Sequence, residues 1–183
     1  MLTSTNNEIA RRETRKALPL PKVRANLDFT ESYSAQEFEL IKRGLIPEGM
    51  KDKWFIFFEE PWLYFHGGWT GASIFGIRFQ SSASGASVVE SWASRDPKAW
   101  GVKNTGYEQV LLKFLIDVFL LGQSACFPVP SNLPRDVPKG LYQHAIIGRA
   151  YQETDYPAGP PPTRPLWFRF RQLFRKRWDW YVV

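Results

Sequence analysis

The residues best suited to chemistry lie in one short stretch, His66-Gly67-Gly68-Trp69-Thr70-Gly71, which follows a segment rich in aromatic residues. The glycines let a phosphate or a ring approach the backbone, whose N–H groups can bind an anion. The imidazole adds an acid–base group, the hydroxyl a hydrogen-bonding group and the indole a stacking surface. We therefore take His66, Trp69, Thr70 and Gly71 as candidate ligand-binding residues. The alternative is a plain hairpin turn in which Trp69 fills the core and His66 ends a strand.

Charged residues near this turn supply the candidate catalytic partners. As an acid–base group, His66 would need a carboxylate to orient it, and Glu59 and Glu90 are the candidates. Solvated turn charges are the simpler interpretation of Glu59 and Glu60, since adjacent residues of a strand point to opposite faces. Arg78 lies in a predicted strand, where it either binds an anion together with the turn or pairs with Glu90 across the sheet.

The second distinctive segment is C-terminal, where basic and aromatic residues alternate from residue 164 to residue 181. As a helix, this segment would place Leu166, Phe170 and Phe174 on one apolar stripe. Such a segment can fold back on the core, dock on a protein partner, lie on an anionic membrane or bind a nucleic acid. The residues predicted to make the contact are Arg169, Arg171, Arg175, Lys176, Arg177, Trp167 and Trp178.

Metal and cofactor chemistry has no signal in the sequence. Two histidines and one cysteine form no cluster with zinc-ligand spacing, so we expect no metal site. Glycine-rich dinucleotide or phosphate-binding motifs and a nucleophile elbow are missing, so we expect no cofactor. The single cysteine, the N-terminal segment without an apolar run and the lack of an apolar stretch of ~18 residues predict a cytoplasmic protein.

The charge is divided unevenly along the 183 residues, whose net charge is +6. Residues 1–27 carry +4, residues 28–127 carry −3 and residues 128–183 carry +5. This division predicts four parts: a basic N-terminal arm (1–27), mobile or strapped over the core, a single domain (28–150), a proline-rich linker (151–165) and a basic aromatic segment (166–183).

The predicted elements of the central domain alternate between two periodicities. Ser34 and Glu37 form a capping box that begins a helix over 34–43. Short aromatic runs separated by turn residues predict strands over 54–58, 62–66, 73–79 and 87–93. A second helix is predicted over 105–121, and 141–149 could add a fifth strand. The fold class is therefore α+β, an antiparallel four- to five-stranded meander with two helices packed on one face and basic flanking tails.

The stretch from Gly44 to His66, GLIPEGMKDKWFIFFEEPWLYFH, resembles a little-characterised bacterial family with the signature GLxPxxMxDKWFI-(Y/F)xE…WLYFHRSWTG. The resemblance covers about Phe38–Phe79. Some members of that family are associated with macro domains or ADP-ribosylglycohydrolases, so the resemblance implies a nucleotide or ADP-ribose ligand. This chain departs from the signature at the turn, where Gly67-Gly68 replace Arg-Ser.

These observations favour a non-enzymatic binding or accessory module of a bacterial cytoplasmic system. It would engage a protein partner, with a nucleotide-like ligand as a further candidate. One alternative is an enzyme of nucleotide or ADP-ribose metabolism that uses His66 as its acid–base group. The other is a protein that associates with a membrane or a nucleic acid through its basic C-terminal segment.

Overall fold

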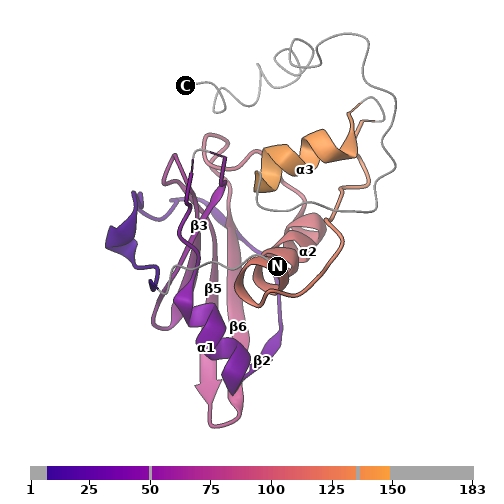
Figure 1. Ribbon diagram of the computed structural model, residues 1–183. Helices are drawn as coiled ribbons and strands as arrows, with labels where there is room; N and C mark the ends of the chain where they lie inside the picture. The colour runs from indigo at the N-terminus through magenta and orange to yellow at the C-terminus, as the bar shows by residue number, and fades with distance from the viewer. Residues whose placement is uncertain (1–7, 50, 135–136, 149–183) are drawn as a thin grey trace.

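The computed structural model describes residues 8–49, 51–134 and 137–148, and its centre is an antiparallel sheet (Figure 1). The strand order is β1-β6-β5-β4-β3, and β2 also pairs with β6. Consecutive strands β3 to β6 form the predicted meander, and β1 and β2 are additional. The strands are β1 (Arg24–Asn26), β2 (Ser32–Ser34), β3 (Trp54–Glu59), β4 (Trp62–Gly67), β5 (Ser73–Ser82) and β6 (Gly85–Ser94). The α+β class and the antiparallel sheet are confirmed.

Three α-helices accompany the sheet: α1 (Ala35–Arg43), α2 (Thr105–Phe114) and α3 (Lys139–Ile147). The capping box that begins α1 is present, since the Glu37 amide donates to Ser34 Oγ at 3.3 Å and the Ser34 amide donates to Glu37 Oε2 at 2.9 Å. Helix α2 continues as a π-helical segment, η2 (Leu115–Leu120), so the predicted helix over 105–121 changes its hydrogen-bonding register near its middle. None of the described helices is long and apolar enough to cross a membrane.

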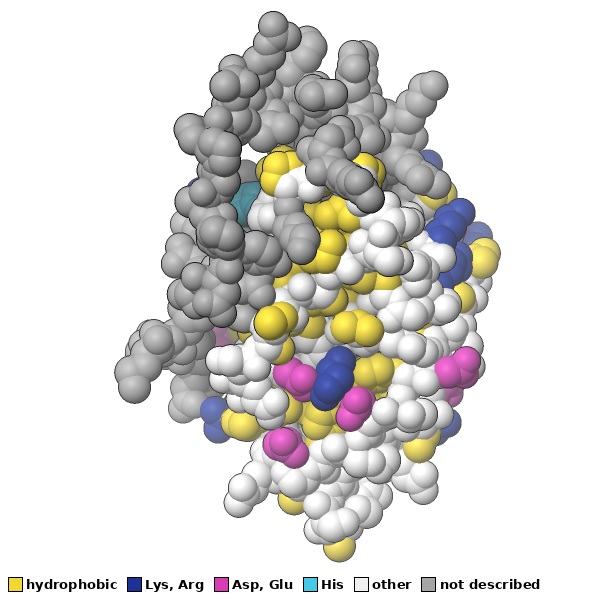
Figure 2. Space-filling view, turned by 90° about the vertical axis from the view of Figure 1, so that its right-hand side faces the viewer, with side chains coloured by type: hydrophobic (Ala, Val, Ile, Leu, Met, Phe, Trp, Pro, Cys, Tyr) yellow, Lys and Arg dark blue, Asp and Glu magenta, His cyan; other side chains and the backbone are white. Residues whose placement is uncertain are grey.

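The main hydrophobic core joins the sheet to the helices. It joins buried side chains of β3 to β6 with Phe38 and Ile41 of α1, Leu111 and Leu112 of α2, and Ile146 of α3. Helices α2 and α3 lie on the right of the sheet in Figure 1. Figure 2 shows that side, where apolar side chains also reach the described surface. Three helices rather than two therefore contribute to the core.

The opposite face of the sheet carries a second, smaller aromatic cluster, which consists of Ala10, Phe55, Phe57, Tyr64 and Trp92. Its cover is an N-terminal strap, residues 8–22, which includes the short 3₁₀ helix η1 (Arg12–Thr14) and lies on the left of the sheet in Figure 1. Both faces of the sheet are consequently buried, which explains why β3 has no polar side chain before Glu59.

The strap is fixed at both of its ends by backbone hydrogen bonds. The Ala10 amide donates to the Arg43 carbonyl at 2.8 Å, and the Leu18 amide donates to the Gly71 carbonyl at 2.8 Å. Between these points the Arg12 guanidinium pairs with Glu59 and lies over the ring of Phe57, 5.3 Å from its centroid. Of the two predicted arrangements, mobile arm or strap, the described part of the N-terminal region forms the strap.

Two local predictions are wrong. Residues 141–147, predicted as part of a strand, belong to helix α3, whose buried Tyr142, Ile146 and Ile147 follow helical spacing and whose C-terminal Gly148 adopts φ 76°. Strict alternation along a strand over residues 73–79 predicts that Ile74 shares a face with Gly76 and Arg78. A bulge between Phe65 and His66 shifts the register of β4 against β5, and Ile74 joins the main core instead.

Candidate functional site

The turn between β4 and β5 is held by bonds among its own atoms. The Gly67 amide donates to the Ala72 carbonyl at 2.9 Å, and the Gly71 amide donates to the Gly67 carbonyl at 2.8 Å. Thr70 Oγ1 accepts from the Ala72 amide at 3.2 Å, so the hydroxyl predicted to bind a ligand is used inside the turn. Gly71 adopts φ 70°, a left-handed conformation that disfavours any side chain.

His66 is fully buried on the second face, beneath the strap. Its ring lies among aromatic side chains, 5.2 Å from the Phe57 centroid and 6.4 Å from those of Phe55 and Tyr64. Nδ1 is 2.8 Å from the Gly71 carbonyl oxygen, and because a carbonyl only accepts, Nδ1 carries the proton. Nε2 has no partner among the described residues. Burial therefore lowers the pKa of His66 below its ordinary value, and the imidazole is neutral.

The strap bonds to the same carbonyl oxygen as this buried imidazole. The Gly71 carbonyl accepts from both His66 Nδ1 and the Leu18 amide, so the turn, the histidine and the strap share one oxygen atom. The backbone of Lys16 is so near to Gly71 that a Cβ added there would lie 2.7 Å from the Lys16 oxygen. The geometry makes His66 a support of the turn and gives it no open path for exchanging protons with a substrate.

Trp69 lies at the tip of the turn and exposes 55% of its surface. The prediction that it fills the core is wrong, since other side chains, Trp54, Ile74 and Phe75 among them, make up the core. Next to Trp69, the Gly68 amide donates to the Lys53 carbonyl at 2.9 Å, which fixes the turn to the start of β3. The indole is thus presented to solvent on a rigid support, and we call residues 67–71 the Trp69 turn.

The remaining candidates lie at the other end of the strands. Arg78 is opposite Trp62 in the register, whereas His66 is opposite Ser73. The Arg78 side chain pairs with Glu90, Nε to Oε2 at 3.0 Å, so the predicted cross-strand pair is confirmed. Glu59 pairs with Arg12, which lowers the pKa of the Glu59 carboxyl. The structure thus brings together His66, Thr70 and Gly71 and separates them from Arg78, Glu59 and Glu90.

The predicted C-terminal contact residues, from Trp167 to Trp178, lie outside the described residues. Among those that are described, no group of three or more histidine, cysteine, aspartate or glutamate side chains is placed to hold a metal ion.

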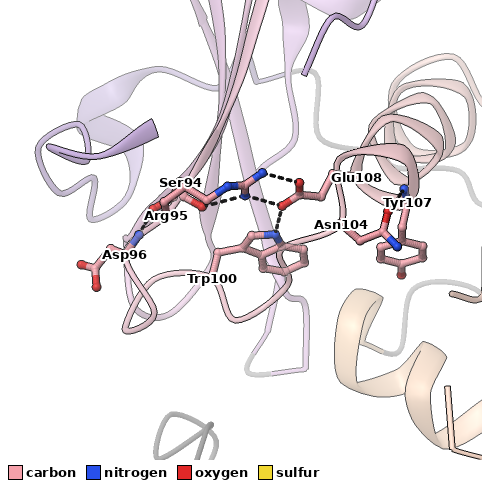
Figure 3. A network of polar contacts seen from close by, with 7 residues as sticks. All are labelled: Ser94, Arg95, Asp96, Trp100, Asn104, Tyr107 and Glu108. Atoms are coloured by element: carbon pink, nitrogen blue, oxygen red, sulfur yellow. Dashed lines mark hydrogen bonds and ion pairs between the residues drawn. The ribbon is translucent and has the colours of Figure 1, made fainter. Parts of the chain in front are cut away.

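A buried ion pair escaped the sequence analysis (Figure 3). Glu108 of α2 is fully buried and accepts from both terminal nitrogens of Arg95, at 2.7 and 2.8 Å, and from Trp100 Nε1 at 2.8 Å. The pattern did contain a signal. Gln109, Lys113 and Asp117 form the polar stripe of this helix, and Glu108 is a charged residue outside that stripe. The network fixes the segment that connects β6 to α2.

Comparison with protein-family models, with curated proteins and with solved structures gave no match to this chain.

Proposed function

We propose that this protein is a non-enzymatic binding module that engages a protein partner through the Trp69 turn. The observation that carries the proposal is a large indole, 55% exposed, on a turn fixed by six hydrogen bonds that join it to itself, to Ala72, to Lys53, to His66 and to the strap. Tryptophan is enriched among the residues that contribute most to protein–protein affinity.

The rigidity of the turn is part of this argument. Binding costs free energy for each group that it immobilises, and a turn that is already ordered avoids much of that cost. The Gly71 amide donates to the Gly67 carbonyl, Gly67 and Thr70 both bond to the backbone of Ala72, and the His66 ring bonds to the Gly71 carbonyl. In the proposed role His66 is a positioning residue, which agrees with its enclosed, neutral ring.

The enzyme alternative has less support. Its acid–base group, His66, is enclosed, and its two carboxylates, Glu59 and Glu90, are paired with Arg12 and Arg78 at the far end of the strands. A nucleotide-like ligand such as ADP-ribose remains a second candidate occupant of the Trp69 turn. The indole could stack on a base, and the exposed Lys16 beside Gly71 offers a cation for a phosphate. The proposal also keeps the basic segment 166–183 as a second contact region and a cytoplasmic location.

Site-specific photocrosslinking tests the proposal. A photoreactive phenylalanine analogue replaces Trp69 in one variant and Val110 in a control, because both residues are 55% exposed and Val110 lies on helix α2. We expect a discrete crosslinked protein from position 69 and none from position 110. Excess unlabelled wild-type protein should compete with the product, and excess Trp69→Ala protein should not. Equal products at the two positions, or none at 69, would count against the proposed surface.

A thermal-shift comparison tests the second candidate. A ligand at a hundred times its Kd stabilises the folded state by about 2.7 kcal/mol. ADP-ribose, NAD and mononucleotides are added to wild type and to Trp69→Ala. A shift in wild type that disappears in the variant supports a nucleotide-like ligand, whereas no shift in either protein rejects it and leaves the protein partner.

A further inference from the structure

A hollow of about 600 Å³ lies at the opposite end of β3 from the Trp69 turn. Its walls are strap residues 9–13, the α1 residues Glu39, Lys42 and Arg43, and Phe58 and Glu59 of β3. The volume falls within the roughly 300–1,000 Å³ of typical ligand sites. The apolar part of the wall includes Phe58 and the side chain of Ile9, which is 50% exposed.

The floor of this hollow contains a free stretch of sheet edge. Strand β3 is the last strand of the sheet, and at Ile56 its outer edge is occupied by Leu45, which exchanges two backbone hydrogen bonds of 2.8 and 2.9 Å. Alternate residues of a strand direct their backbone groups to the same edge, so Phe58 also presents its N–H and C=O outward. Within the described part of the chain, no residue pairs with Phe58 on that side.

The charges around this edge favour an anionic occupant. Four cations line the hollow, and two of them, Lys42 and Arg12, are paired with Glu39 and Glu59. The guanidinium groups of Arg11 and Arg43 form no ion pair with any described residue. Of the carboxylates in the wall, only that of Glu13 likewise forms no ion pair with a described residue. The unpaired groups therefore sum to one positive charge.

We propose that this hollow binds an extended, carboxylate-rich segment of another protein, which adds as a short strand to β3 at Phe58. Backbone hydrogen bonds would supply the part of the affinity that does not depend on the sequence of the segment, as in other cases of strand addition. Arg11 and Arg43 would select carboxylates through charge-assisted hydrogen bonds, and Ile9 and Phe58 would contact apolar side chains of the segment. This site is separate from the Trp69 turn.

The test uses a fluorescein-labelled peptide of alternating valine and glutamate, six residues long, with both termini blocked. Fluorescence anisotropy measures its affinity for wild type and for the variants Arg11→Glu, Arg43→Glu and Lys98→Glu. Lys98 is exposed in the loop between β6 and α2, so its variant makes the same charge change outside the hollow. We expect binding about tenfold weaker for each arginine variant and unchanged for Lys98→Glu. Circular dichroism confirms that the variants fold.

Two further measurements separate strand addition from simple charge attraction. A peptide of the same sequence with N-methylated backbone amides keeps every carboxylate and loses its donors, and it should no longer bind. Amide NMR resonances of Phe58 and Arg43 should move with the unmethylated peptide, whereas those of Trp69 should not. Equal affinity for the methylated peptide, no binding at 1 mM, or shifts centred on Trp69 would each overturn the proposal. Because the Trp69 turn uses other residues, either proposal can fail alone.

Discussion

Replacing Arg95 by alanine should destabilise the protein far more than replacing Arg78 by alanine, although each arginine pairs with one glutamate. The Arg95 side chain is 16% exposed and its partner Glu108 is fully buried. The Arg78 and Glu90 side chains are 41% and 50% exposed. Removing one partner of a buried ion pair leaves an uncompensated charge and costs about 3–5 kcal/mol. An exposed pair typically contributes about 0–1 kcal/mol.

The structure narrows the stability loss that we expect for Arg95→Ala. Arg95→Ala removes two of the three hydrogen bonds that Glu108 accepts and leaves the one from Trp100. Because water reaches part of the Arg95 side chain, we expect a loss near the lower limit, about 3 kcal/mol. With a urea m-value of about 2 kcal/mol per molar, the unfolding midpoint should fall by about 1.5 M. For Arg78→Ala it should fall by less than about 0.5 M.

Urea unfolding followed by circular dichroism measures both midpoints. A second variant, Arg95→Ala with Glu108→Leu, removes the buried carboxylate as well and should regain part of the lost stability, since the penalty comes from the unpaired charge. Equal losses for the two single variants would refute the buried-pair reasoning. So would a double variant less stable than Arg95→Ala alone.

Three further predictions concern the turn, the strap and the first helix. Because burial lowers the pKa of His66 in the folded protein, the unfolded chain binds a proton at this residue more readily than the folded protein does. The unfolding free energy of wild type should therefore fall as the pH drops below about 6.5, by at most about 1.4 kcal/mol per pH unit. Urea titrations from pH 7.5 to 5 should show that His66→Asn lacks this component. Gly71→Ala should lower the unfolding free energy more than Gly122→Ala. Both residues have φ near 70°, where an alanine costs about 1–2 kcal/mol, but only at position 71 would the added Cβ meet the Lys16 backbone, since nothing lies within 4 Å of it at position 122. Equal thermal midpoints for the two variants would contradict the strap contact. Ser34→Ala should cost about 1 kcal/mol by loss of the capping box, measured as a shift of the urea midpoint, and an unchanged midpoint would argue against the cap.

The sequence predicted the elements whose signals are local. The capping box of Ser34 and Glu37 marked the start of α1, and the aromatic runs between turn residues marked the four strands of the meander. Strands β1 and β2 contain three residues each, too few for a periodic pattern, and both exist because they pair with β6. Helix α3 was missed because a short apolar run fits a strand or a helix equally well.

The candidate site was predicted in part, because only its local contacts have a signal in the sequence. The residue types of the Trp69 turn are visible in the sequence, and its contact between His66 and Gly71 spans only five positions. Leu18 and Lys16 of the strap contact Gly71, and nothing in a turn motif indicates that a segment so distant in sequence will pack there. The ion pair of Arg95 and Glu108 likewise depends on how α2 docks, which is a property of the whole fold.

The position of the strap has a consequence for the order of synthesis. Residues 8–22 leave the ribosome before the groups that they bind, at Arg43, Glu59 and Gly71. Until β3 and β4 have paired, the strap has no surface to cover. Translation, at about 5–20 residues per second, imposes a delay of several seconds. The aromatic side chains Phe55, Phe57 and Tyr64 therefore emerge only after the residues that will cover them, so the strap can close over them as soon as β3 and β4 have paired.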